Sequence, residues 1–247
     1  MSGPTSLAPG PTISTFQSRS VPDSPERSAG QPISPTRAEI EEAANLIRSG
    51  KLVAFPTDTF YALGANALDG AAVEKLYVAK GRGGDKPVPV LLASAEDVIL
   101  VASSFPDRAR ALAERYWPGP LTLVLPARPE VPSRVTGGTG TVGVRVPDHE
   151  LARRLVSTSR APVTGTSANL SGNRPCKEAA EVRSQLGKHI DSVLEGKCGP
   201  HAEPSTVVDC AIGLRVLREG AIPAQEILGH LSSEELGHST GPRAWPP

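Results

Sequence analysis

From Thr36 onward the sequence alternates short apolar runs with segments of helical periodicity, and this alternation restricts the fold more than any other feature. A T-x-x-E capping box at Thr36 and Glu39 opens the first helix, and Gly50 closes it. The apolar run 52–55 predicts a strand directly after this helix. Strands interleaved with helices favour an α/β fold, namely an open, twisted, mixed β-sheet with flanking helices and with binding sites on loops at strand ends.

The same patterns predict the remaining elements of this α/β segment. Helices are expected behind Asp69, from Ser94, at 107–116, from Asp148 and at 177–186. Strands are expected at 88–93, 121–125, 142–146, 162–166, 192–194, 206–209 and 214–217.

The two ends of the chain differ in composition from this segment. Residues 1–35 are rich in Pro, Ser, Thr and Gly and carry too few apolar side chains to form a core, so we expect a disordered tail. Because the tail is short of acidic residues, a mitochondrial or plastid transit peptide is the alternative to a cytoplasmic chain. Residues 234–247 are expected to form a second flexible tail, which leaves one globular domain at 36–233.

The overall composition excludes several classes of function. Lysine plus arginine and aspartate plus glutamate each number 26, so the net charge is zero and any anion must be bound locally. The three cysteines and five histidines are too scattered for a disulfide framework or a zinc site, so we expect no metal bound by protein side chains and a reducing cytoplasm. No apolar run reaches the roughly 20 residues that span a bilayer, so we expect no membrane partner.

A loop at 80–87 concentrates three cations, Lys80, Arg82 and Lys86, among three glycines. Glycines let the backbone approach a phosphate, and arginine and lysine side chains hold its oxygens, so the loop is interpreted as a clamp for a polyanion or a carboxylate. A cation at a helix end also complements the helix dipole, and this explains Lys80 taken alone. The loop is not a Walker A sequence.

Arg145 lies in the apolar run 142–146, where an unpaired charge would cost on the order of several kcal/mol. Two partners are open at this point, a structural Asp or Glu and the carboxylate of a ligand. The preceding loop 137–141 is rich in glycine and threonine, as is typical of loops that close over ligands.

Polar segments also follow strands at 56–64 and 164–172. The first contains Thr57, which either forms a Ser/Thr turn or contacts a ligand. The second contains Ser167 and Asn169, whose spacing suits an anion or a ribose but also a helix-capping turn.

Together and in this order, the polar segments resemble the YrdC-like family of threonylcarbamoyl-adenylate synthases. The motifs that carry the resemblance are P-T-D-T, K-G-R with a later K-P, G-V-R-V-P, T-S-A-N, S-T-V-V-D and R-E-G, and they span roughly residues 40–222. The resemblance implies the YrdC-like fold with a concave, positively lined cleft, and makes 36–233 a catalytic domain. Ala62 and Gly83 depart from the family pattern, but neither replaces a contacting side chain.

The resemblance also implies roles for individual residues. Those implied around L-threonine are Thr57, Lys86, Arg145, Gly165 and Ser205. Those implied around ATP are Lys80, Arg82, Thr141, Ser167, Asn169 and Arg218, with Lys80 and Arg82 in the catalytic role.

The implied activity is that of a nucleotidyltransferase, which joins L-threonine, bicarbonate and ATP into threonylcarbamoyl-AMP and releases pyrophosphate. Magnesium would arrive with ATP, and no side-chain nucleophile is needed, in keeping with a sequence that has no triad and no carboxylate pair. The product would pass to a threonylcarbamoyl transferase complex that modifies tRNA at the adenosine next to the anticodon, which suggests a contact with tRNA.

Two alternative functions remain. The first is a non-catalytic RNA-binding paralogue of the same fold, which zero net charge and 4% aromatic residues disfavour because single-strand binding uses basic grooves and stacking platforms. The second is the carbamoyl-adenylate-forming domain of hydrogenase maturation enzymes, which carries C-x-x-C arrays that this chain lacks.

Overall fold

The computed structural model describes residues 34–83, 86–201 and 203–229. The predicted tails at 1–35 and 234–247 lie outside these residues, apart from Ser34 and Pro35.

The helices follow from local signals in the sequence. They are α1 (Arg37–Arg48), α2 (Gly70–Lys80), the 3-10 helix η1 (Ala95–Leu100), α3 (Asp107–Tyr116), α4 (Ser133–Thr136), α5 (Glu150–Ser159), α6 (Ala179–Leu186) and α7 (Ala224–Gly229). The predicted capping box of α1 is confirmed, because the Glu39 N–H donates to Thr36 Oγ1 at 3.2 Å while the Glu39 carboxylate accepts from the Thr36 N–H at 2.7 Å. Asp69 caps α2 by accepting from two backbone N–H groups, and Gly81 ends it at a φ of 59°.

The predicted mixed α/β class is confirmed. The strands form two mixed sheets instead of the single sheet that the sequence predicted. The small sheet has the order β7-β2-β1-β8, and the large sheet has the order β10-β9-β4-β5-β3-β6. The strands are β1 (Val53–Pro56), β2 (Tyr61–Gly64), β3 (Val90–Leu91), β4 (Leu121–Pro126), β5 (Thr141–Arg145), β6 (Val163–Thr164), β7 (Thr166–Ser167), β8 (Ser192–Val193), β9 (Thr206–Asp209) and β10 (Arg215–Arg218).

One chain segment connects the two sheets. The expected strand at 162–166 is split, because β6 pairs with β3 in the large sheet and β7 pairs with β2 in the small one. Gly165 lies between the two short strands, and a Cβ there would come within 2.4 Å of Leu91 Cγ. A side chain at this position would therefore collide with the large sheet just where the chain changes sheets.

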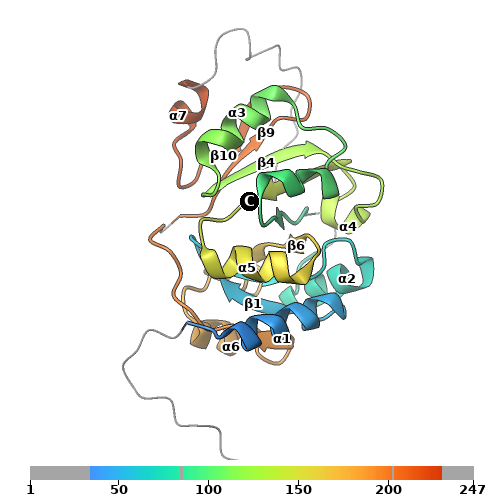
Figure 1. The fold of residues 1–247 in the computed structure, drawn as a ribbon, viewed down its shortest axis with the longest axis vertical. Coiled ribbons are helices and arrows are strands. Elements are labelled where there is room, and N and C mark those ends of the chain that lie inside the picture. The colour runs from blue at the N-terminus through green and yellow to red at the C-terminus, as the bar shows by residue number, and fades with distance from the viewer. Residues whose placement is uncertain (1–33, 84–85, 202, 230–247) are drawn as a thin grey trace, which may run out of the picture. The chain divides into compact units, whose positions relative to one another are not determined.

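Two apolar clusters stabilise the fold. The smaller one packs the buried face of α1 against α5 and β1, and Figure 1 shows α1 and α5 side by side next to β1. The larger one includes residues of both sheets together with the buried faces of α2, α3 and α6. Both clusters are built from aliphatic side chains at helical and strand spacing, whose burial is worth roughly 25 cal/mol per Å² of apolar surface.

Three observed elements differ from the sequence prediction. The run Tyr61–Gly64, expected to be part of a polar segment, is strand β2 and closes an antiparallel hairpin with β1. The helix expected from Ser94 is the 3-10 helix η1. The strand expected at 88–93 pairs over only two residues, β3. In the described part of the chain, every helix is too short or too polar to span a lipid bilayer.

Candidate active site

A pocket of about 280 Å³ lies on one face of the large sheet, opposite the β1–β2 hairpin and β7. Five of its lining residues are cross-strand neighbours in the sheet. The strand register sets them side by side in the order Leu91, Arg145, Thr122, Val207, Arg218. The pair of Arg145 and Thr122 follows when the register of β5 and β4 is continued by one residue beyond Val144 and Leu123. The pocket floor is thus a single row of side chains across five strands, spaced about 4.8 Å apart.

Arg145 is held in this row by three hydrogen bonds. Its Nε donates to the Gly119 carbonyl at 2.9 Å, Nη1 donates to Thr59 Oγ1 at 3.3 Å, and Nη2 donates to Asp58 Oδ2 at 2.6 Å. The Asp58 side chain is 2% exposed and the Arg145 side chain is 8% exposed, so the ion pair is buried. A guanidinium has five N–H groups, and two of them remain uncommitted next to the pocket.

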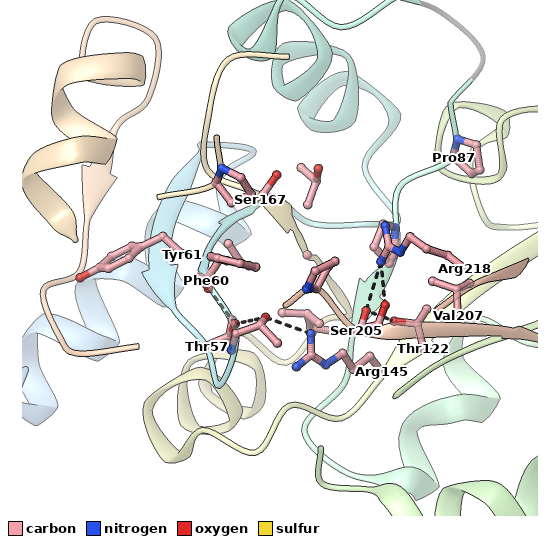
Figure 2. Close-up of a pocket in the computed structure, with 18 of the residues that line it drawn as sticks. Thr57, Phe60, Tyr61, Pro87, Thr122, Arg145, Ser167, Ser205, Val207 and Arg218 are labelled. Carbon is pink, nitrogen blue, oxygen red and sulfur yellow. Dashed lines mark hydrogen bonds between the residues drawn. The ribbon is translucent and has the colours of Figure 1, made fainter. Parts of the chain in front are cut away.

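The β1–β2 hairpin supplies the wall above Arg145. Its loop is a Ser/Thr turn, in which Thr57 Oγ1 donates to the Phe60 carbonyl at 2.7 Å and accepts from the Thr59 N–H at 3.2 Å. The Ser/Thr turn is confirmed, and Thr57 also lines the pocket (Figure 2). Asp58 Oδ1 is buried and has no hydrogen-bond partner among the described residues.

Arg218 and Ser205 form the opposite end of the row. Arg218 Nη2 donates to the Ser205 carbonyl at 2.9 Å, and Ser205 Oγ lies 2.9 Å from Thr122 Oγ1 (Figure 2). Burial and the nearby charge of Arg145 lower the pKa of the Arg218 guanidinium from its usual value. Arg218 Nε is buried and unpaired within the described part, which leaves it available to an anion.

Arg82 approaches the pocket from the loop behind α2. Its Nη1 donates to Thr166 Oγ1 at 3.2 Å and its Nη2 donates to the Pro87 carbonyl at 3.2 Å, while its buried Nε finds no acceptor in the described residues. Burial lowers its pKa. Arg82 therefore keeps a donor for a ligand, as Arg218 does.

Lys80, predicted to face the nucleotide, lies outside the pocket lining. It is 3% exposed, and its Nζ donates to the carbonyls of Ser167 and Asn169, the latter at 2.8 Å. Burial, followed by the neighbouring Arg82, lowers its pKa to about 7. In this structure the Lys80 side chain ties the end of α2 to the T-S-A-N segment.

The structure brings together seven of the residues that the resemblance implied. The pocket is lined by Thr57, Arg82, Arg145, Gly165, Ser167, Ser205 and Arg218. Lys80 and Asn169 lie behind it, and the Asn169 side-chain amide donates to the carbonyls of Leu170 and Asn173, both at 2.8 Å.

Lys86 and Thr141 do not line the pocket. Lys86 is exposed on the loop that leads to β3. Thr141 lies four residues before Arg145 on β5 and, because side chains alternate along a strand, on the same face. It is about 13 Å from Arg145 along the strand, and Gly143 between them adds no side chain to that face.

Several pocket residues were not predicted from the sequence. Leu91, Thr122 and Val207 belong to apolar strand patterns, and only the sheet register shows that they face the pocket. Asp58 was within the P-T-D-T motif but was not assigned a role, although it forms a buried ion pair with Arg145 at 2.6 Å.

The charged side chains that line the pocket are cationic. Three arginines line it, and among the described residues its lining includes no Asp or Glu. Within the described ranges, no group of three His, Cys, Asp or Glu side chains gathers in a way that could hold a metal ion. Fold and pocket together define an α/β protein with a cationic pocket, whose lining suits small anionic ligands.

Comparisons with known proteins agree with this class. Residues 45–220 match the model of the Sua5/YciO/YrdC family, described as "Telomere recombination". The threonylcarbamoyl-AMP synthase of Pyrococcus abyssi is 45% identical over 197 residues, which are 77% of this chain and 58% of that protein. A putative threonylcarbamoyl-AMP synthase of Mycobacterium tuberculosis is 40% identical over 76% of this chain and 87% of its own length. The chain therefore belongs to the Sua5/YciO/YrdC family.

A solved structure shows the same fold. The crystal structure of P. abyssi Sua5 complexed with L-threonine superposes with a TM-score of 0.78 at 41% identity, over 83% of this chain and 60% of that one. The chain thus spans little more than half the length of the Pyrococcus relative.

Proposed function

We propose that this protein is an L-threonylcarbamoyladenylate synthase, a nucleotidyltransferase that uses L-threonine, bicarbonate and ATP. The observation that carries the proposal is the pocket that Arg82, Arg145 and Arg218 line together, without a carboxylate in the part of its lining that the structure describes. All three substrates are anionic or carry a carboxylate, and in a chain of zero net charge this local excess of cations selects for such ligands.

Arg145 is suited to the amino-acid carboxylate. Its two uncommitted N–H groups can donate charge-assisted hydrogen bonds to a carboxylate, which are stronger than neutral ones. The hydroxyl groups of Thr57 and Ser205 stand on either side of it in the lining. The Pyrococcus protein crystallised with L-threonine supports this assignment by its family relation.

Arg82 and Arg218 are suited to the phosphates of ATP. Each keeps a buried Nε without a partner in the described residues, and Ser167 adds a hydroxyl beside Arg82. Magnesium would be held by the phosphates, since the described lining residues provide no carboxylate, and when bound it would neutralise phosphate charge. Lys80 supports this half of the pocket by fixing the segment that carries Ser167.

The reaction then needs positioning and charge neutralisation. The threonine amine attacks CO₂ from bicarbonate and loses a proton, which gives a carbamate. A carbamate oxygen attacks the α-phosphorus, the bond to the β-phosphate oxygen breaks, and pyrophosphate leaves with the charge that the arginines neutralise. Burial raises the pKa of Cys176 and of Cys198 to about 11, so neither thiol is a nucleophile at neutral pH.

The catalytic domain in this proposal is 36–233, and we place the protein in a reducing compartment, the cytoplasm, on the basis of its three free cysteines. Its product, a mixed anhydride, requires a transferase that accepts the threonylcarbamoyl group on tRNA. A chain that lacks residues 1–33 should keep its activity, because the capping box of α1 begins only at Thr36.

The deciding experiment gives the purified protein ATP, Mg²⁺, bicarbonate and one amino acid at a time, and measures pyrophosphate. Threonine should stimulate release in a bicarbonate-dependent manner, and mass spectrometry should detect the adenylate. RNA binding without amino-acid-dependent pyrophosphate release would instead support the non-catalytic paralogue.

A further inference from the structure

Leu91 is the apolar neighbour of Arg145 in the pocket floor. The two residues are register partners on the parallel strands β3 and β5, and both line the pocket. Leu91 is 2% exposed, so its position is fixed by packing. The missing side chain of Gly165 makes room for it, since a Cβ there would lie 2.4–2.9 Å from three carbons of the Leu91 side chain.

The other neighbour of Arg145 is polar. Continued register from β5 to β4 places Thr122 beside Arg145 on the side away from Leu91. The Thr122 hydroxyl pairs with Ser205 Oγ at 2.9 Å, and Arg218 Nη2 lies 3.5 Å from the same oxygen. An amino acid whose carboxylate binds Arg145 therefore has an apolar side chain, Leu91, on one side of it and hydroxyl groups, from Thr122 and Ser205, on the other.

Threonine has substituents that match both sides, because its β-carbon carries a methyl group and a hydroxyl group. We propose that Leu91 is the specificity-determining residue that receives the methyl group, while Thr122 and Ser205 face the hydroxyl. This inference rests on the proposed function and adds the basis of selection between threonine and serine. One methyl group in an apolar pocket discriminates by roughly 10-fold to 200-fold.

Leu92 provides a matched control. It is the same residue type, is fully buried and is adjacent in sequence, but it belongs to the larger apolar cluster whereas Leu91 belongs to the smaller one. Side chains alternate between the two faces of an extended chain, so Leu92 points away from the pocket. Its truncation removes a similar core volume without changing the pocket lining.

The experiment measures kcat/KM for threonine and for serine, by pyrophosphate release, in the wild type, Leu91→Ala and Leu92→Ala. Leu91→Ala should lower the threonine-to-serine ratio by roughly 10-fold or more, while Leu92→Ala should leave the ratio within about 2-fold. Leu91→Val repeats the test with a smaller truncation if the alanine variant does not fold, and it should lower the ratio by less.

The outcomes separate this inference from the proposed function. If Leu91 variants lose threonine and serine activity equally, Leu91 is a core residue alone and the inference is wrong while the activity stands. L-allo-threonine, in which the methyl and hydroxyl positions are exchanged, should be a poorer substrate than L-threonine for the wild type, and equal use would also contradict it. If the wild type neither releases pyrophosphate with any amino acid nor binds threonine by calorimetry, the proposed function fails first.

Discussion

Asp58 Oδ2 lies 2.6 Å from Arg145 Nη2, and both side chains are buried beside the pocket. The sequence left two anionic partners open for Arg145, a structural carboxylate and a ligand. The structure provides the first and leaves two N–H groups for the second. The three hydrogen bonds, one from each nitrogen, fix the guanidinium in the pocket lining.

Replacement of Arg145 by lysine should weaken threonine binding selectively. Lysine keeps a charge to pair with Asp58 but lacks the planar fork, so we expect the Kd for threonine to rise at least about 10-fold and the Kd for ATP to change by less than about 3-fold. Isothermal calorimetry measures both. Equal weakening of ATP and threonine binding would assign Arg145 to the phosphates or to a purely structural ion pair.

Replacement of Arg82 by alanine should weaken nucleotide binding. A hydrogen bond from a charged group is worth roughly 1.5–3 kcal/mol, so ATP affinity and the rate of adenylate formation should fall at least about 10-fold. Arg128→Ala is the control, because Arg128 pairs with Glu130 on the surface, away from the pocket. A normal Kd for ATP in Arg82→Ala would remove this arginine from the site.

Replacement of Lys80 by methionine should destabilise the fold as well as reduce activity. The change keeps the length of the side chain but removes the donors to the carbonyls of Ser167 and Asn169, and each unsatisfied buried carbonyl costs roughly 1–3 kcal/mol. Urea denaturation should show a lower free energy of unfolding than for Lys188→Met, which changes an exposed lysine. An unchanged stability with lost activity would return Lys80 to a direct catalytic role.

The same lysine predicts a pH dependence of stability. Burial and Arg82 lower the pKa of Lys80 from 10.5 to about 7 in the folded protein. Between these two values the unfolded chain binds a proton that the folded protein does not, so raising the pH stabilises the folded state; below pH 7 both states are protonated and the contribution no longer changes. The difference in unfolding free energy between wild type and Lys80→Met should therefore increase from pH 7 to 9, by at most about 1.4 kcal/mol per pH unit. A difference that decreases over this range would contradict the lowered pKa.

Gly165→Ala should disturb the junction of the two sheets. The new Cβ would meet Leu91 carbons at 2.4–2.9 Å, and forced shifts in a packed core cost roughly 1–3 kcal/mol. We expect a lower melting temperature and at least about 10-fold lower activity. Gly70→Ala, whose Cβ would meet only Pro132 at 3.9 Å, should change neither.

The sequence predicted the elements whose signals are local. The capping box at Thr36 and Glu39 and the cap at Asp69 start their helices as expected, because a cap depends only on residues within one turn. The strand Tyr61–Gly64 was missed because it directly follows a polar turn and was assigned to the same polar segment. Only its pairing with β1 in the structure identifies the hairpin.

The three arginines of the pocket could be predicted from the sequence, but the positions of Lys80 and Lys86 and the arrangement of the lining could not. Arg82, Arg145 and Arg218 line one pocket as the resemblance implied. The environment of Lys80 depends on the carbonyls of Ser167 and Asn169, which are 87 and 89 residues further along the chain. The neighbours of Arg145 depend on the sheet register, which local sequence patterns do not encode.

The pocket floor also has a consequence for how the protein acquires activity during synthesis. Its five neighbouring strands draw on residues from Leu91 to Arg218, and its wall begins at Thr57. Contacts between such distant segments form late in folding, after long loops have closed. While β10 is still inside the ribosome, the nascent chain lacks Arg218 in the pocket and the row of five side chains is incomplete. The ability to bind a ligand therefore arises only when the end of the domain has emerged.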